Sequence, residues 1–240
     1  MEKDVDLGQT FCIRADVIGS RRTDKANELP EIAALLNKEF QVTVLTPFTV
    51  RAGDELFAVL KGESDGYLAF KTLYSFSREW DIPLYVGLGT GELESQQFKD
   101  AERVNGQAIW RASQALEELK MKPPSDILKR VGTYKFRFNI HVSEDKDLNL
   151  AVEHFLYLIM ARVMKRTKHQ ALAVETKEKY PNWNNDRLFW HISKTNEAEM
   201  PSENASANFS KLMLRADYQL VREAETSFVY LLKQLNEKTR

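Results

Sequence analysis

The sequence predicts an α+β fold, in which a ferredoxin-like palm is followed by an all-helical C-terminal domain. In such a palm, helices cover one face of an antiparallel sheet. Two observations predict this class. As far as residue 120, short apolar runs alternate with stretches of helical periodicity in the order β-α-β-β-α-β-α. From Asp147 onward nearly every segment has helical periodicity. We therefore expect domains of residues 1–146 and 147–240.

The first strand and helix are predicted at residues 9–16 and 24–40. The strand is rich in Phe, Cys and Ile, and the helix begins at Asp24 as a plausible N-cap. A second strand, residues 41–50, contains Pro47, which a strand tolerates only at the edge of a sheet or at a break. The return strand is Leu56–Leu60.

A second helix is predicted at 64–80, a third at 104–120, and a strand at each of 84–90 and 134–142. In the last strand aromatic and aliphatic residues alternate with Lys, Arg, Asn and His, which predicts a half-buried strand with a basic outer face. The strand at 84–90 and the residue after it carry glycine at every second position. Such a stripe fits either close packing of a helix or close approach of a ligand. The glycines are Gly87, Gly89 and Gly91.

The C-terminal half begins with an apolar stripe that includes Leu150, His154, Leu158 and Ala161. A basic stretch, Arg162–His169, follows it. We expect a short helix around residues 186–192, and one or two helices in residues 204–237.

Composition favours an ordinary globular protein of the cytoplasm. The 240 residues are 43% hydrophobic and 29% charged, and the net charge of −1 predicts no general attraction to nucleic acid or anionic lipid. The single cysteine excludes an internal disulfide, and the four histidines lack zinc-ligand spacing. Neither a signal peptide nor a run of about 18 apolar residues is seen, so no membrane association is expected.

Acidic residues at the ends of two predicted strands suggest a metal site. Asp16 ends the first strand, and Asp54 and Glu55 follow Gly53 at the tip of a hairpin. Hard carboxylate oxygens in such an arrangement suit Mg²⁺ or Mn²⁺. In the alternative interpretation, Asp16 only caps the next helix and the hairpin tip is merely solvated.

The turn after the first strand is a candidate cradle for phosphate groups. Its main-chain N–H groups precede a predicted helix, and two arginines add positive charge. The expected cofactor-binding residues are Val17, Ile18, Gly19, Ser20, Arg21 and Arg22.

These motifs resemble those of class III nucleotide cyclases. Residues 11–20 resemble the first metal motif, 51–54 the second, and 86–92 the glycine-rich strand that follows, while Gly-Asp-Glu-Leu-Phe at 53–57 also resembles the diguanylate cyclase signature. Together with the helix at 106–117, the pattern most resembles the bacterial SatD family. The resemblance implies a palm fold, a nucleoside triphosphate or cyclic nucleotide as ligand, and a homodimer.

Departures from the cyclase pattern weigh against catalysis. The helix positions that carry a transition-state Asn and Arg in cyclases align with Trp110 and Gln114, and Arg111 is the candidate catalytic substitute. The base-selecting positions align with Val50 and Arg103. The resemblance therefore implies a regulatory protein that senses a nucleotide, with an active metal-dependent cyclase or nucleotidyltransferase as the alternative.

A further alternative is a DNA-binding transcriptional regulator. Residues 208–218 resemble the recognition helix of a helix-turn-helix. However, residues 196–204 are acidic and broken by Pro201, and residues 196–215 have a net charge of −1. DNA binding requires several cations that neutralise phosphates, so a packing or dimerisation role is favoured for this degenerate helix-turn-helix.

Overall fold

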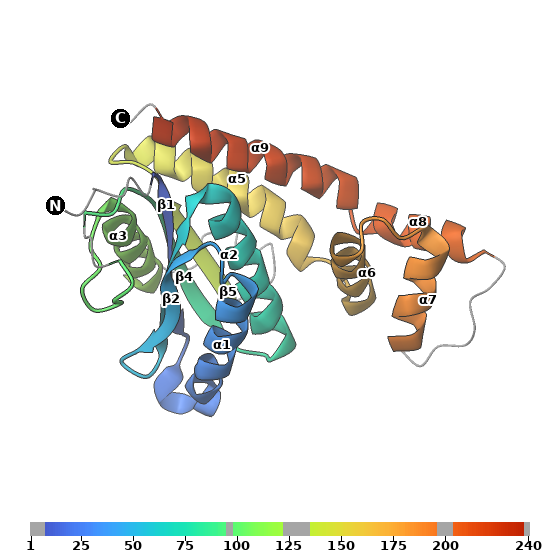
Figure 1. Cartoon of the computed structure of the whole chain (residues 1–240), viewed down its shortest axis with the longest axis horizontal. Coiled ribbons are helices and arrows are strands. Elements are labelled where there is room, and N and C mark those ends of the chain that lie inside the picture. The colour runs from blue at the N-terminus through green and yellow to red at the C-terminus, as the bar shows by residue number, and fades with distance from the viewer. Residues whose placement is uncertain (1–7, 95–97, 122–134, 196–203, 238–240) are drawn as a thin grey trace. The chain divides into compact units, whose positions relative to one another are not determined.

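The computed structural model describes residues 8–94, 98–121, 135–195 and 204–237 (Figure 1). One sheet contains five strands in the order β2-β3-β1-β4-β5. The strands are β1 (Thr10–Val17), β2 (Val44–Arg51), β3 (Glu55–Lys61), β4 (Leu84–Gly91) and β5 (Phe136–His141). The helices around the sheet are α1 (Leu29–Glu39), α2 (Gly62–Glu79) and α3 (Gln107–Met121).

The order of elements up to α3 is the one that the sequence predicts. Strand β1 lies at the centre between β3 and β4 and pairs antiparallel with both. Strand β2 lies at an edge of the sheet, as Pro47 predicts, and its pairing with β3 shifts register on either side of Thr46.

Two features of the predicted palm are wrong. The sheet is mixed, because β5 pairs parallel with β4. Helices also cover both faces rather than one. Phe70 of α2 packs against Phe136 and Phe138 of β5, with ring centroids 5.7 and 5.4 Å apart, whereas α3 packs on the opposite face.

The glycine stripe of β4 is explained by α3. A Cβ atom built on Gly87 would lie 2.6 Å from the backbone nitrogen of Leu116, and closer still to the carbonyl oxygen of Ala112. A Cβ atom built on Gly89 would likewise clash with the backbone of α3, one helical turn nearer the N-terminus of that helix. Of the two interpretations open in the sequence, close packing of a helix is therefore the one seen at these positions.

Helix α3 also explains why the predicted basic outer face of β5 is wrong. Arg137, Asn139 and His141 are all at most 8% exposed, since they lie on the face that α3 helps to cover. A smaller correction concerns the first helix. Residues Asp24–Glu28 form a 3₁₀ turn, and α1 begins only at Leu29, with Pro30 in its first turn.

The remaining described residues are helical: α5 (Lys146–Met164), α6 (Lys168–Lys179), α7 (Asn185–Thr195), α8 (Ala205–Arg215) and α9 (Tyr218–Glu237). The predicted break at Pro201 lies outside the described residues. The chain forms two compact units, Met1–His154 with Val229–Arg240, and Phe155–Phe228. In the second unit, α6, α7 and α8 share a core of Ala173, Leu188, Ile192 and Phe209. No described helix has the length and apolar character needed to cross a membrane.

Cys12 gives a direct test of this packing. The thiol is fully buried on β1, and burial raises its pKa to about 12. We expect a thiol reagent at pH 8 to label the native protein at least about 1,000-fold more slowly than the protein in denaturant, because labelling requires opening of the sheet. A native labelling rate within tenfold of the denatured rate would show that β1 is not enclosed.

Candidate functional site

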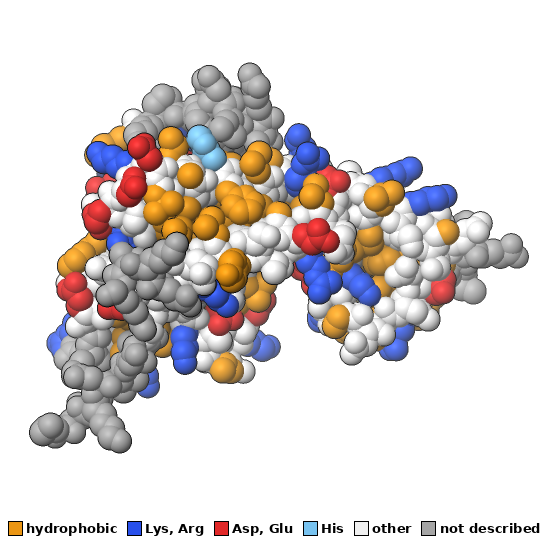
Figure 2. Space-filling model, turned by 90° about the horizontal axis from the view of Figure 1, so that it is seen from above, with side chains coloured by type: hydrophobic (Ala, Val, Ile, Leu, Met, Phe, Trp, Pro, Cys, Tyr) orange, Lys and Arg blue, Asp and Glu red, His pale blue; other side chains and the backbone are white. Residues whose placement is uncertain are grey.

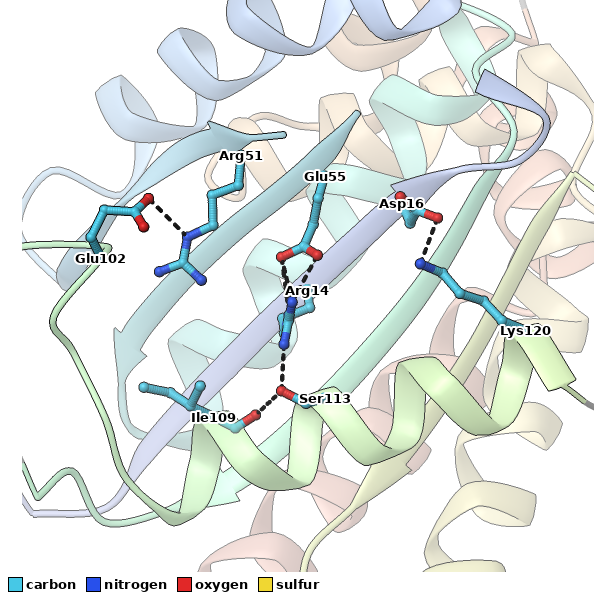
Figure 3. A network of polar contacts seen from close by, with 8 residues as sticks. All are labelled: Arg14, Asp16, Arg51, Glu55, Glu102, Ile109, Ser113 and Lys120. Carbon is cyan, nitrogen blue, oxygen red and sulfur yellow. Dashed lines mark hydrogen bonds and ion pairs between the residues drawn. The ribbon is translucent and has the colours of Figure 1, made fainter. Parts of the chain in front are cut away.

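Strand alternation brings a set of charged side chains to the α3-facing side of the sheet. Arg14 and Asp16 lie two residues apart on β1, so they share one face. The register places Asp16 opposite Glu55 of β3, and Glu55 opposite Arg51 of β2. Lys120, near the end of α3, reaches the same region (Figure 3). These five residues are called the charged corner below.

Glu55 is held by Arg14. Both carboxylate oxygens of Glu55 accept hydrogen bonds from the guanidinium, at 2.7 to 3.0 Å. Arg14 also donates to the hydroxyl of Ser113 on α3, which in turn donates to the carbonyl oxygen of Ile109 (Figure 3). Burial disfavours the charged form of Arg14, but the hydrogen bonds and charge of Glu55 outweigh it and raise the pKa of the guanidinium.

The two aspartates also have partners. Lys120 Nζ lies 2.7 Å from Asp16 Oδ2. Asp54 Oδ2 accepts a hydrogen bond of 2.7 Å from the hydroxyl of Ser20, and the backbone carbonyl of Asp54 accepts one of 3.1 Å from the amide of Val17. These two hydrogen bonds join the hairpin tip at Asp54 to the end of β1 and to the turn that follows β1.

The turn that carries Asp54 is a tight connection between β2 and β3. Ala52 and Gly53 both have positive φ, 49° and 89°. Glycine adopts this region freely, whereas alanine is strained there by about 1 kcal/mol. The turn therefore uses a strained residue to hold Arg51 and Glu55 in register at the end of the sheet.

Arg51 is the least neutralised cation of the charged corner. Its guanidinium carbon lies 3.6 Å from the centroid of the Phe57 ring, and its side chain is 21% exposed. The ion pair found for it in the described chain is with Glu102, at 3.9 Å, and that carboxylate is 81% exposed. Burial is the main reason why the pKa of Arg51 is lowered. A stacked guanidinium leaves its flat N–H fork available for an oxyanion.

The three predicted metal ligands are neighbours in the backbone, yet their side chains do not fit a metal ion as they stand. Asp16 and Glu55 are bound by side-chain cations, and Asp54 by a hydroxyl. Among the described residues, no three His, Cys, Asp or Glu side chains are grouped so that they could hold an ion. Arg14 and Lys120 supply the positive charge that a divalent cation would bring.

The predicted phosphate cradle, residues 17–22, is partly used by the fold. The N–H groups of Val17, Ile18 and Arg22 already donate to the carbonyl oxygens of Asp54, Pro83 and Gly19. Gly19 has a φ of 73°, and Ser20–Arg22 form one short 3₁₀ turn. The side chains of Arg21 and Arg22 are exposed.

Arg111, the candidate catalytic residue, lies at the other end of the sheet. It is 4% exposed and donates a hydrogen bond of 2.8 Å to the carbonyl oxygen of Thr90. Thr90 pairs with Phe11, which is three residues from Arg14 and five from Asp16 along β1. At about 3.4 Å per residue, these separations are roughly 10 Å and 17 Å. The exposed positions Trp110 and Gln114 are on the outer surface of α3.

No family model and no curated protein matches this chain. Among solved structures, the chain is similar to a bacterial light-regulated adenylyl cyclase, with a TM-score of 0.36 and 12% identity. The similar region covers 48% of this chain and 72% of the other.

The sequence-based search missed Arg14, Arg51 and Lys120. A usable signal was present for Arg14, because Arg14 and Asp16 interrupt an otherwise apolar strand at two positions of the same face. Charged residues within a central strand need partners, and such partners often belong to functional sites. No local pattern pointed to Lys120, which lies in the last turn of an ordinary amphipathic helix.

Proposed function

We propose that the protein is a nucleotide-binding regulatory protein, and that the charged corner binds the phosphate groups of its ligand. The observation that carries the proposal is the state of Arg51, which is stacked on Phe57 and partly buried, and whose ion pair within the described residues is a long one to an exposed carboxylate. Desolvated, weakly compensated arginines are costly unless a ligand supplies the anion.

The neighbouring groups suit a phosphorylated ligand. After burial, the nearby charge of Arg14 also lowers the pKa of Arg51, so the two guanidiniums lie close together although Glu55 neutralises Arg14. Lys120, which Asp16 neutralises, is 40% exposed and has further N–H groups that it can donate to a phosphate at the same end of the sheet. The choice of a nucleotide among phosphorylated compounds rests on the resemblance of residues 11–20 and 51–57 to cyclase motifs. The regulatory role rests on the helical unit that accompanies the sheet.

The proposal assigns no step to a metal ion. The carboxylates of Asp16 and Glu55 already neutralise Lys120 and Arg14, so a cation would have to break both ion pairs before it could be bound. The proposal does not depend on Mg²⁺ or Mn²⁺. The experiment below tests separately whether either ion binds together with the nucleotide.

The test is a binding screen with an Arg51 variant. The panel contains ATP, GTP, CTP, UTP, cyclic nucleotides and pyrophosphate, each with and without Mg²⁺ or Mn²⁺, measured by thermal shift and calorimetry. We expect at least one nucleotide to raise the melting temperature. Arg51→Leu should weaken that binding at least about tenfold, because a charge-assisted hydrogen bond contributes about 1.5–3 kcal/mol.

Lys38→Gln, at an exposed position of α1, is the matched control and should bind as the unaltered protein does. Arg51→Leu should also unfold at a similar or higher denaturant concentration, since it removes a desolvated charge and keeps contact with Phe57. The proposal fails if no compound in the panel shifts the melting temperature, or if Arg51→Leu binds normally. Analysis of products from labelled nucleotides would separate a sensor from an enzyme.

A further inference from the structure

Helix α5 has an apolar stripe that faces solvent. Val152, Leu156 and Met160 are buried on one side of the helix, but Leu150 is 48% exposed and Leu158 69%. His154, midway between these leucines, is exposed as well. Figure 2 shows hydrophobic side chains gathered over α5 and α9. Monomeric proteins rarely leave such groups together without a partner.

The stripe is symmetric about its centre. Leu150, His154 and Leu158 are spaced by four residues, so they lie on one face of this continuous helix. The same face extends three residues before Leu150 to Asp147 and four residues beyond Leu158 to Arg162, both of which are exposed. The order of side chains is therefore acid, leucine, histidine, leucine, base.

We propose that this face of α5 is the contact surface for a second copy of the chain, with the two α5 helices antiparallel and the two-fold axis at His154. In that register Leu150 of each copy lies level with Leu158 of the other. Asp147 of each copy lies within one residue, about 1.5 Å along the axis, of the level of Arg162 of the other. The interface is isologous, as a closed dimer requires.

Charge decides the direction of the helices. A parallel pair would place the two Asp147 carboxylates together and the two Arg162 guanidiniums together, whereas the antiparallel pair joins unlike charges. Arg162 already forms an ion pair of 3.1 Å with Asp217, but its side chain is 55% exposed and its N–H fork can bind a second carboxylate.

The apolar contact runs from Leu150 to Leu158, about two turns of helix on each side, so it is smaller than a standard interface and the dimer should be weak. Sedimentation equilibrium from about 1 µM to about 300 µM covers the range expected of such an interface. We expect the unaltered chain to pass from monomer to dimer in this range. Leu158→Glu should remove the dimer, and His154→Leu should tighten it at least several-fold by adding apolar surface at the axis.

Charge reversals test the register itself. Asp147→Arg and Arg162→Asp should each weaken the dimer, because each brings like charges together. The double variant should restore it, because the unlike pairs re-form with their signs exchanged. Val42→Glu is the matched control, since Val42 is 88% exposed on the sheet unit and should leave association unchanged. Melting temperatures would show that each variant is folded.

A chain that stays monomeric over the whole concentration range would overturn the proposal, as would dimerisation of Leu158→Glu at the affinity of the unaltered chain. Failure of the double charge reversal to recover the dimer would overturn the antiparallel register. These outcomes are independent of whether the charged corner binds a nucleotide.

Discussion

Gly87→Ala is expected to cost about 3 kcal/mol or more of the free energy of unfolding, a large fraction of the stability of a typical folded domain. The added methyl group would lie 2.6 Å from the nitrogen of Leu116 and closer to the carbonyl oxygen of Ala112. Both are backbone atoms inside a helix, so no side chain can rotate away. Either α3 separates from β4 or its hydrogen bonds distort. Urea unfolding, followed by circular dichroism or by labelling of Cys12, measures the loss.

Gly8→Ala is the control for this experiment. Gly8 precedes β1, nothing lies within 4 Å of a Cβ built there, and its φ of 62° adds only the strain of a left-handed alanine, about 1 kcal/mol. A loss for Gly87→Ala no greater than that for Gly8→Ala would show that α3 does not pack on β4 at this distance.

Glu55→Ala is expected to cost about 2 kcal/mol, the second largest effect. It would leave the guanidinium of Arg14 without its carboxylate in a site where the two side chains are only 23% and 14% exposed. Removing one partner of a fully buried ion pair costs about 3–5 kcal/mol, and the residual exposure of Arg14 reduces this figure. Chemical denaturation at pH 7 gives the measured value.

The double variant Arg14→Leu with Glu55→Leu separates the net contribution of the ion pair from the cost of leaving Arg14 buried without a partner. We expect it to be close to the unaltered protein in stability, because replacing both charges removes the cost of desolvation together with the ion pair. Lys135→Gln provides an exposed comparison, since Lys135 and its partner Asp81 are 65% and 66% exposed, and no measurable loss is expected. Equal losses for Glu55→Ala and for the double variant would mean that Arg14 is adequately solvated without its carboxylate.

The Arg14–Glu55 pair is therefore expected to add little to stability beyond what an apolar pair would add. Charged groups that stability does not require are typical of binding sites. If the double Arg14 and Glu55 variant is as stable as the unaltered protein but fails to bind the ligand found in the screen, the pair serves binding rather than stability.

Periodicity alone was sufficient for the elements of the sheet and their order. The apolar run at Phe11–Ile13 predicted a strand, and Pro47 predicted the edge position of β2. These signals are local, because each depends on residues within a few positions of one another. The acidic hairpin at Gly53–Glu55 was found in the same way.

The partners of those residues are not local, and the tertiary structure decided them. Arg14 pairs with a carboxylate 41 positions away and a hydroxyl 99 positions away, and Asp16 meets Lys120 from the far end of α3. Likewise, the sequence showed a stripe on α5 but not that Leu150 and Leu158 face solvent. A pattern gives the face of an element on which a residue lies. What that face meets depends on packing between elements distant in the chain, and this packing placed two side-chain cations beside the carboxylates predicted to hold a metal.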